Sequence, residues 1–414
     1  MQHRYKIRCS KNTMHCIFWF FLLNSLSVAA TEKTLMLYHD ADWSNNIESA
    51  NAIWQGVHVA LAEVNYRVQG YRIQLVKKDH RGNVLRSKRN LDAFLKDENA
   101  LAVISGMHSP PLIKYRKYIN QNKILTLVPW AAGGSITRYP SPDNWIFRLS
   151  VDDTKAGAVL VDHAVNALGC KSPHLFLENG PWGQSNLKNI NIALREADIQ
   201  YRGVTRFGRN LRRYDASSKL IAMTNAGADC VLLVAGVYEG AQIANAMAGL
   251  GADMRLPIIS HWGITGGSFH QQVEPSQRKK ISLYFIQSCF SFLKNPLSLK
   301  GQSVFENAQH QFPEEIATPK DIRSPVGFVH GYDITQLLLE ALRDVNLDAN
   351  AASRRNDVRL ALENIKRPVV GLVKEYSSPY RKFSPSDLDA HEALSVNDYC
   401  MAYYNGDNDI ILAL

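Results

Sequence analysis

The feature that most constrains the fold is a repeated alternation of short β-rich runs and amphipathic helical segments. The first series is expected to hold four strands, at 34–38, 72–76, 101–106 and 123–128. The second series begins near Ser150 and is expected to hold four more, at 174–177, 201–205, 229–235 and 256–260. Such alternation is typical of parallel sheets with crossover helices. We therefore expect an α/β chain with two open parallel-sheet lobes, ending in a hairpin around Asn405-Gly406.

The first thirty residues have the layout of a cleavable secretory signal. Four basic residues and no acid precede the apolar core 17–23, and small residues close the segment at Val28–Ala30. We expect cleavage before Thr31 and a periplasmic location. The apolar core is shorter than the length that a membrane-spanning helix needs, so an uncleaved membrane anchor is the less favoured alternative.

The length and charge of the mature chain restrict its number of domains and its kind of binding partner. Removing the signal leaves 414 − 30 = 384 residues, which suits two domains. The formal charge falls from +9 by four, to about +5, and the remaining basic residues are scattered. A nucleic-acid interface would need basic residues interleaved with stacking aromatics on one face, so we expect no nucleic-acid partner.

The mature chain keeps four cysteines, Cys170, Cys230, Cys289 and Cys400. Their wide, irregular spacing fits neither a zinc site nor a disulfide-dense scaffold. One bridge is possible in an oxidising compartment. Cys170 and Cys230 are the favoured pair, because each lies at or just before a predicted strand of the same lobe; two buried thiols fit the sequence equally well.

The candidate site lies in the loops that follow the predicted strands, because open α/β sheets bind ligands beyond the carboxyl ends of their strands. Ser109 opens a helix there, where a hydroxyl and free backbone N–H groups can bind a carboxylate, although it could serve only as a helix cap. Tryptophans in such loops favour an aromatic-lined cleft. They are Trp43, Trp130, Trp182 and Trp262.

Several short motifs occur in an order that resembles a known family. They are Gly56–Asn65, Asp79, Gly106 with Ser109, the Pro129 loop ending at Thr137, Tyr214–Ser217, and Gly331–Asp333. With these motifs the chain resembles the type I periplasmic binding proteins of the leucine/isoleucine/valine branch, which feed ABC importers. Each motif by itself is weak evidence, but their order is specific. The resemblance covers nearly the whole mature chain.

The resemblance implies two lobes joined by three hinge crossings, with a cleft that closes on an amino acid or a similar molecule. We place the crossings near 148–151, 282–288 and 369–376. The N-terminal lobe would then contain 31–149 plus about 285–372. The C-terminal lobe would contain 150–284 plus about 373–414. The expected partners are a small-molecule ligand and an ABC permease, and the protein is expected to be a monomer.

The resemblance also assigns roles to site residues. Ser109 would hold a ligand carboxylate, and the loop of Trp130, Ala131 and Ala132 would offer backbone groups. Trp182 would cover the ligand from the second lobe, and Tyr238 would lie near its amino group.

Two residues depart from the family pattern. Ala132 stands where amino-acid binders often have a hydroxyl residue, and Trp262 stands where they place the acid that pairs with the ligand ammonium. A buried ammonium without a carboxylate partner is costly. Either Glu239 or Asp42 therefore substitutes, or the ligand is not an α-amino acid. A cationic or neutral ligand caged by tryptophans also fits.

Enzyme activity and sensing are the alternatives to solute transport. The sequence lacks the common catalytic and phosphate-binding motifs, and its histidines are dispersed, so we expect no enzyme activity, no metal and no cofactor. A periplasmic sensor for a membrane signalling protein would use the same cleft closure as its readout. The sequence does not separate transport from sensing.

Overall fold

The computed structural model describes residues 32–141 and 143–413, and residues from Lys33 onward form one unit. The expected signal at 1–30 lies outside the described residues. Within the described part of the chain, no helix combines the length and the apolar character that crossing a membrane requires.

The first lobe is built on a six-stranded sheet in the order β2-β3-β1-β4-β5-β6. Its strands are β1 (Thr34–Ala41), β2 (Arg67–Val68), β3 (Tyr71–Asp79), β4 (Ala100–Ser105), β5 (Thr126–Val128) and β6 (Ile146–Arg148). All neighbours pair in parallel except β2 and β3. Its helices are α1 (Ile47–Ala62), α2 (Val84–Lys96), α3 (Ser109–Gln121), α10 (Leu299–Gln311), α11 (Pro325–Leu342) and α12 (Ala351–Leu362).

The second lobe is built on a seven-stranded sheet in the order β15-β14-β11-β10-β9-β7-β8. Its strands are β7 (Pro173–Glu178), β8 (Gly203–Phe207), β9 (Cys230–Val234), β10 (Ile258–Ser260), β11 (Leu283–Ser288), β14 (Tyr399–Tyr404) and β15 (Ile410–Ala413). The strands from β8 to β11 are parallel, whereas β14 and β15 add an antiparallel edge. Its helices are α4 (Asp153–Asp162), α5 (Pro181–Glu196), α6 (Arg213–Asn225), α7 (Val237–Gly249), α8 (Phe269–Gln272) and α9 (Pro275–Arg278).

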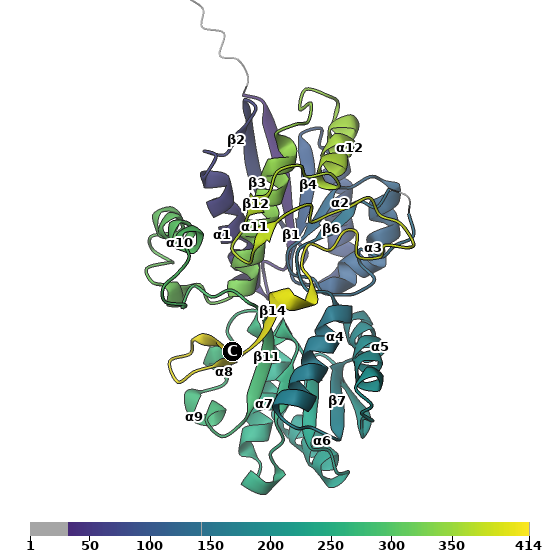
Figure 1. Cartoon of the computed structure of the whole chain (residues 1–414), viewed down its shortest axis with the longest axis vertical. Helices are drawn as coiled ribbons and strands as arrows, with labels where there is room; N and C mark the ends of the chain where they lie inside the picture. Colours follow the sequence, from purple (N-terminus) through teal and green to yellow (C-terminus); the bar gives the residue numbers. More distant parts are fainter. Residues whose placement is uncertain (1–31, 142, 414) are drawn as a thin grey trace, which may run out of the picture. The chain divides into compact units, whose positions relative to one another are not determined.

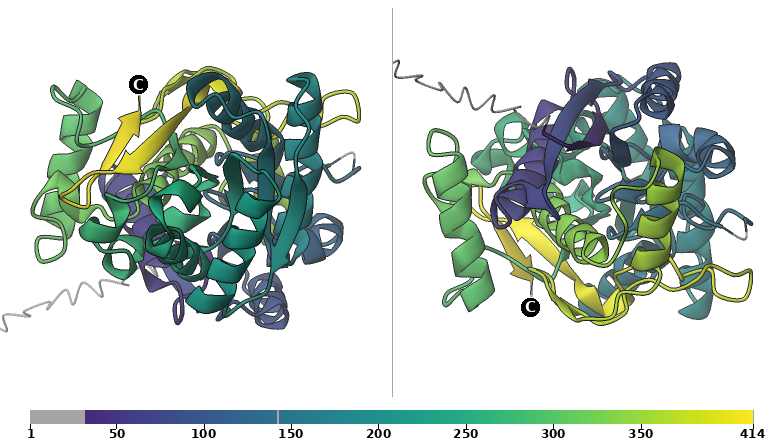
Figure 2. Two further views of the ribbon diagram at one scale, coloured as in Figure 1. Left: turned by 90° about the horizontal axis from the view of Figure 1, so that it is seen from below. Right: turned by 90° about the horizontal axis from the view of Figure 1, so that it is seen from above.

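The two sheets confirm the predicted α/β class with two parallel-dominated lobes. In Figure 1 the first sheet and its helices occupy the upper half and the second sheet the lower half. Helices cover both faces of the sheets; α1 and α11 lie on the opposite face of the first sheet from α2 and α3 (Figure 2). The terminal hairpin predicted around Asn405-Gly406 is formed by β14 and β15.

Two motif glycines allow α1 and α11 to cross in close contact. A Cβ on Gly56 would lie 2.0 Å from the backbone oxygen of Phe328, and a Cβ on Gly331 would lie 2.7 Å from the oxygen of Ile53. Distances this short are sterically forbidden, so any larger residue would push the helices apart. The glycines in two of the motifs that carried the resemblance therefore serve helix packing.

Asp333 ties α11 to the segment that returns toward the second lobe. Its buried carboxylate accepts hydrogen bonds from the N–H groups of Leu372 and Val373, at 2.6 and 3.0 Å, and from the hydroxyl of Tyr376, at 2.7 Å. Burial raises the pKa of Asp333 to about 6 despite these donors. The short pair β12 (Val369–Val370) and β13 (Glu375–Tyr376) is held in place by this carboxylate.

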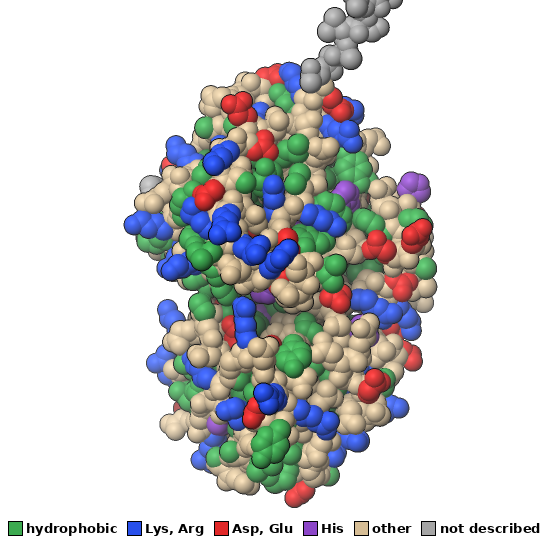
Figure 3. Space-filling view, turned by 180° about the vertical axis from the view of Figure 1, so that it is seen from behind, with side chains coloured by type: hydrophobic (Ala, Val, Ile, Leu, Met, Phe, Trp, Pro, Cys, Tyr) green, Lys and Arg blue, Asp and Glu red, His purple; other side chains and the backbone are tan. Residues whose placement is uncertain are grey.

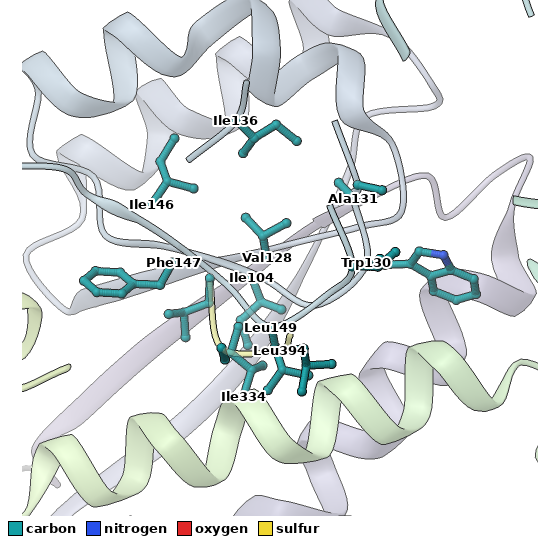
Figure 4. Close-up of a cluster of buried hydrophobic side chains, with 14 of the residues drawn as sticks. Ile104, Val128, Trp130, Ala131, Ile136, Ile146, Phe147, Leu149, Ile334 and Leu394 are labelled. Carbon is teal, nitrogen blue, oxygen red and sulfur yellow. The ribbon is translucent and has the colours of Figure 1, made fainter. Parts of the chain in front are cut away.

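The core of the first lobe continues directly into the loop that carries Trp130. Figure 4 shows Val128, Trp130 and Ala131 following one another along this segment, with Ile334 of α11 close by. Val128 and Ala131 are fully buried, and Trp130 is 1 % exposed. This packing fixes the backbone of a loop that borders the cleft described below.

Two disulfides connect segments that are far apart in the sequence. Cys170 is bonded to Cys230, which confirms the favoured pair, and Cys289 is bonded to Cys400. The second bridge was not expected from the sequence. The cysteines of the second bridge come together because β11 and β14 pair side by side, a pairing between strands that are distant in the sequence.

The chain passes between the sheets three times. The first two passages lie near the expected positions, whereas the third follows Glu392, beyond the expected 369–376. It leaves β6 at Arg148 and enters α4 at Asp153; the second passage follows β11, which ends at Ser288 inside the second sheet. Residues after Tyr376 return along the first sheet, where His391 stacks on Phe147, before β14 begins. The exact boundaries between the lobes stay a proposal.

Candidate functional site

A cleft of about 650 Å³ lies where the strand ends of the two sheets face each other. Its lining comes from the loops after β1, β3, β4, β5, β7, β8, β9 and β10. In the space-filling view the surface is hollowed between the upper and the lower lobe (Figure 3). This is the location expected for ligands of open α/β sheets.

The lobes touch each other around this cleft. The Gly134 N–H donates to the Ser185 hydroxyl across it, at 3.2 Å. A Cβ on Gly266 would lie 3.1 Å from Cε of Met107, and one on Gly267 would lie 2.8 Å from Cβ of Glu48. The first lobe supplies one partner in each contact and the second lobe the other. These contacts join the two lobes around the cleft.

Ser109 and His108 line the cleft from the first lobe. Ser109 is the first residue of α3 and is 4 % exposed, and its hydroxyl oxygen accepts a hydrogen bond from the Gly133 N–H at 3.0 Å. Its own hydroxyl hydrogen remains available to donate. Burial, reinforced by the neighbouring His80, lowers the pKa of His108 to about 4. The neutral histidine adds no positive charge to the site near neutral pH.

The loop after β5 places Trp130 and Ala132 in the lining, whereas Ala131 is buried and does not border the cleft. The six-membered ring of Trp130 packs on Gly327, where a Cβ would lie 2.7 Å from Cζ3. The indole Nε1 of Trp130 is buried and has no hydrogen-bond partner among the described residues. An unpaired buried N–H is costly.

Arg148 holds the backbone of this loop from behind. Its fully buried guanidinium donates to the carbonyl oxygens of Ala131 and Gly133, at 3.3 and 2.9 Å. Its Nε donates to Oε2 of Glu392 at 2.9 Å, so the charge is paired. Glu392 comes from the returning C-terminal segment and was not expected at the site.

The second lobe contributes Trp182, Tyr238 and Trp262 to the lining. Trp182 begins α5 and is half-buried, and its ring lies against Gly263, where a Cβ would be 2.6 Å from Cη2. Trp262 is 1 % exposed, and its ring packs edge-on against His330 at 5.5 Å. Tyr238 is 48 % exposed at the start of α7. Six of the seven expected site residues therefore border one cleft, all except Ala131.

Asp153 lies behind this wall and was not predicted. Its buried carboxylate accepts hydrogen bonds from Trp182 Nε1 at 3.1 Å and Asn186 Nδ2 at 2.8 Å. It also accepts the Gly134 N–H at 3.3 Å, and His261 Nε2 lies 3.4 Å away. The acid thus links a first-lobe loop to the second-lobe aromatic residues. The only feature of the sequence that could have indicated Asp153 is its position: an acid at the start of a helix, just after the expected crossing at 148–151.

Three carboxylates line the cleft itself, Asp42, Glu178 and Glu239. Asp42 and Glu239 are the two acids that the sequence suggested as replacements for the missing ammonium partner. Asp42 accepts hydrogen bonds from the Asn45 N–H and from Asn46 Nδ2, each at 2.9 Å. Glu239 accepts the N–H of Asn210 at 3.1 Å.

Glu178, the third carboxylate, was not singled out from the sequence. It is the last residue of β7 and directly precedes the loop to α5. Burial raises the pKa of Glu178 to about 6; the Arg209 charge opposes this effect, while Glu239 and Asp153 add to it. The signal in the sequence was an acid at the carboxyl end of a buried strand.

The described residues contain one group with metal-ligand side chains close together, Cys170, Asp229 and Cys230. The two cysteines are joined in a disulfide, and the Asp229 carboxylate accepts the N–H groups of Lys171 and Ser172 at 2.7 and 2.9 Å. These atoms are already engaged, so the group does not suit a metal ion.

The family model for periplasmic binding proteins matches residues 44–377, which is most of the chain. The chain belongs to the periplasmic binding protein family. This agrees with the resemblance found from the motifs, and the family is one of solute-binding proteins rather than enzymes. No curated protein sequence matches the chain.

Solved structures of this family share the fold at low sequence identity. The branched-chain amino acid transporter substrate-binding protein LivJ of Streptococcus pneumoniae, in complex with isoleucine, is 17 % identical with a TM-score of 0.73, over 92 % of this chain and 100 % of that one. A solute-binding protein of an R. palustris ABC transporter, in complex with benzoate, is also 17 % identical with a TM-score of 0.73, over 92 % and 95 %. A type 1 periplasmic binding protein of Bordetella pertussis has 14 % identity and a TM-score of 0.74, over 92 % and 99 %.

Proposed function

We propose that this periplasmic binding protein is exported through a cleaved signal and captures a small polar solute, an amino acid or an amine compound, for an ABC importer. The observation that carries the proposal is the cleft of about 650 Å³ with lobe-to-lobe contacts around it. A cavity of this size suits a ligand of amino-acid to drug size.

The chemistry of the lining supports a solute with both polar and flat or apolar parts. Trp130, Trp182 and Trp262 supply apolar walls, and Ser109 supplies a hydroxyl at a helix start, where N–H groups favour an anion such as a carboxylate. The structural relatives bind isoleucine and benzoate, each of which carries a carboxylate beside an apolar group.

A thermal-shift screen of the purified protein tests the proposal. The panel contains amino acids, amides, polyamines, quaternary amines and small organic acids. A ligand that binds only the folded state raises the melting temperature, by an amount that grows with its concentration. We expect at least one class to do so. No stabilisation by any class would contradict solute capture.

A further inference from the structure

Glu178 is a cleft carboxylate with few compensating contacts. The Asp42 and Glu239 carboxylates are hydrogen-bonded to neighbouring segments of their own lobes. Glu178 receives a hydrogen bond from the backbone N–H of Gly183, but forms no ion pair within residues 32–141 and 143–413. A partly buried carboxylate without a cationic partner destabilises the folded state.

The charges that face Glu178 come from three other segments of the second lobe. Glu239 belongs to α7, Asp153 begins α4, and Arg209 lies in the loop after β8. Two of these three groups are acids. Arg209 is exposed and makes no ion pair within the described residues, yet its charge acts on Glu178 more strongly than either acid does, and the pKa of Glu178 is raised nonetheless. Arg206 also lies close, since its Nη1 donates to the backbone oxygen of Glu178 at 3.2 Å. A positive solute group would therefore relieve the repulsion that Glu239 and Asp153 exert on Glu178.

The second-lobe wall of the cleft is aromatic. Trp182 lies four residues after Glu178 in the sequence, and Trp262 and Tyr238 complete the lining on this side. Aromatic faces attract cations electrostatically, with more effect where water is excluded. A carboxylate beside aromatic rings is thus a suitable environment for a protonated nitrogen, because it offers hydrogen-bond acceptors as well as charge.

We infer that the solute carries a protonated nitrogen with N–H donors, an ammonium or guanidinium group, and that Glu178 binds it against the aromatic wall of Trp182. This inference rests on the proposed function, since it names the solute class of the same cleft. Glu178 would then replace, from another strand, the acid that Trp262 displaces.

The first test compares probes that share a skeleton and differ in charge. Benzylamine, benzamide and benzoate form one series, and butylamine, butyramide and butyrate form another; agmatine, betaine and isoleucine extend the panel. Melting temperature is measured with each probe at pH 7.5. We expect the largest shifts from cations that carry N–H donors. Stabilisation by carboxylates or betaine but by none of these cations would overturn the inference and leave solute capture standing. No stabilisation by this panel or by the wider screen would contradict both the inference and solute capture.

The second test assigns the effect to Glu178. For the best cationic probe, Glu178→Gln should weaken binding at least tenfold by calorimetry, because the replacement keeps the shape and removes the charge. Glu196→Gln, at the exposed C-terminal end of α5, the helix that follows β7, should bind normally. Unchanged affinity in Glu178→Gln would overturn the inference. If Glu178→Gln does not fold, Glu239→Gln serves instead. Loss of this neighbouring charge should lower the affinity for the cationic probe about threefold or more. Unchanged affinity would count against the inference.

The third test uses pH on the wild-type protein. Protonation of Glu178 removes the charge that attracts the cation. Because the pKa of Glu178 is about 6 in the free protein, affinity for the cationic probe should fall about tenfold between pH 7.5 and pH 5. His108 remains neutral over this range, since burial lowers its pKa to about 4. Constant affinity over this range would contradict the assignment to Glu178.

Discussion

The indole Nε1 of Trp182 donates a hydrogen bond to the buried carboxylate of Asp153, with 3.1 Å between the two atoms. The same carboxylate accepts the N–H of Gly134 in the first lobe at 3.3 Å. The orientation of the aromatic wall is therefore coupled to contact between the lobes. A change at Trp182 should alter ligand binding more than stability, because its ring is only half-buried.

The Trp182→Phe variant separates the hydrogen bond from the ring. It keeps an aromatic face but loses the donor to Asp153, a bond worth about 1.5–3 kcal/mol when the acceptor is charged. We expect affinity for a ligand found in the screen to fall about tenfold, and more for Trp182→Ala. Isothermal calorimetry measures the effect. Trp54→Phe, in α1, is the matched control and should bind as the wild type does.

If Trp182→Ala binds its ligand with wild-type affinity, the cleft is not the binding site. Circular dichroism confirms that each variant is folded before affinities are compared. The melting temperature of the free Trp182→Phe variant should fall by only a few degrees, since each kcal/mol corresponds to about 2 degrees or less in a chain of this size.

Ser109→Ala removes the oxygen that accepts the Gly133 N–H. It should weaken binding of a solute with a carboxylate, while the protein still folds. The buried N–H left without its partner costs about 1–3 kcal/mol, which lowers the melting temperature slightly. Affinity and melting temperature of Ser109→Ala are compared with those of Ser141→Ala, a partly exposed serine outside the cleft lining. Wild-type affinity for every carboxylate ligand would show that Ser109 has only a structural role.

The order of strands and helices was predictable from the sequence because it depends on local apolar periodicity. The helix α12 was not predicted. Three arginines, Arg354, Arg355 and Arg359, are buried on it, and Arg354 donates to the carbonyl oxygen of Glu98 at 2.6 Å. A helix whose inward face carries arginines shows no apolar stripe in the sequence.

The site was predictable in part, for a similar reason. The loops with Ser109, Trp130, Trp182, Tyr238 and Trp262 follow strands, and parallel topology places strand ends together. The roles of Asp153, Glu178 and Glu392 depend on burial and on neighbours from distant segments. Glu392, for example, is 244 residues from the arginine that it neutralises. No local pattern encodes such a pairing.

The stability of the free protein should depend on pH through Glu178. Burial raises its pKa from the usual 4.5 to about 6, so the folded state binds this proton more tightly than the unfolded state does. Protonation of Glu178 therefore contributes favourably to the free energy of unfolding below about pH 4.5, and this contribution is lost as pH rises through about 6. Relative to wild type, Glu178→Gln should therefore gain stability over this interval, by about 1–2 kcal/mol.

Thermal or urea unfolding at a series of pH values measures this difference. Other groups with shifted pKa values, such as Asp333 and the buried histidines, are common to both proteins and cancel in the comparison. A difference between wild type and Glu178→Gln that does not change between pH 4.5 and pH 7 would contradict the burial of an ionisable carboxylate at this position.

The Cys289–Cys400 disulfide should contribute substantially to stability. It closes a separation of 111 residues and joins the end of β11 to β14. Long closed loops restrict the unfolded chain strongly, so the paired replacement Cys289→Ser and Cys400→Ser should cost about 2–5 kcal/mol. Urea unfolding measures the loss. Peptide mapping without reduction should find the two cysteines in one linked peptide; free thiols at both would contradict the bridge.

The buried pair of Arg148 and Glu392 gives the sharpest prediction about stability. Glu392→Ala leaves the fully buried guanidinium without its counter-charge, and breaking a buried pair from one side costs about 3–5 kcal/mol. Glu375→Ala, at an exposed position in β13, is the control and should change stability little. Because Arg148 also holds the carbonyl of Gly133, Glu392→Ala should weaken ligand binding as well.

The double variant Arg148→Met and Glu392→Leu distinguishes charge pairing from simple packing. Replacing both charges removes the unpaired guanidinium, so the double variant should be more stable than Glu392→Ala alone. It should still bind ligand poorly, because the carbonyl oxygens of Ala131 and Gly133 lose their donor and the loop with Trp130 loosens. Recovery of stability together with full affinity would show that the loop does not need Arg148. Failure to recover stability would show that the pair is held mainly by packing rather than by charge.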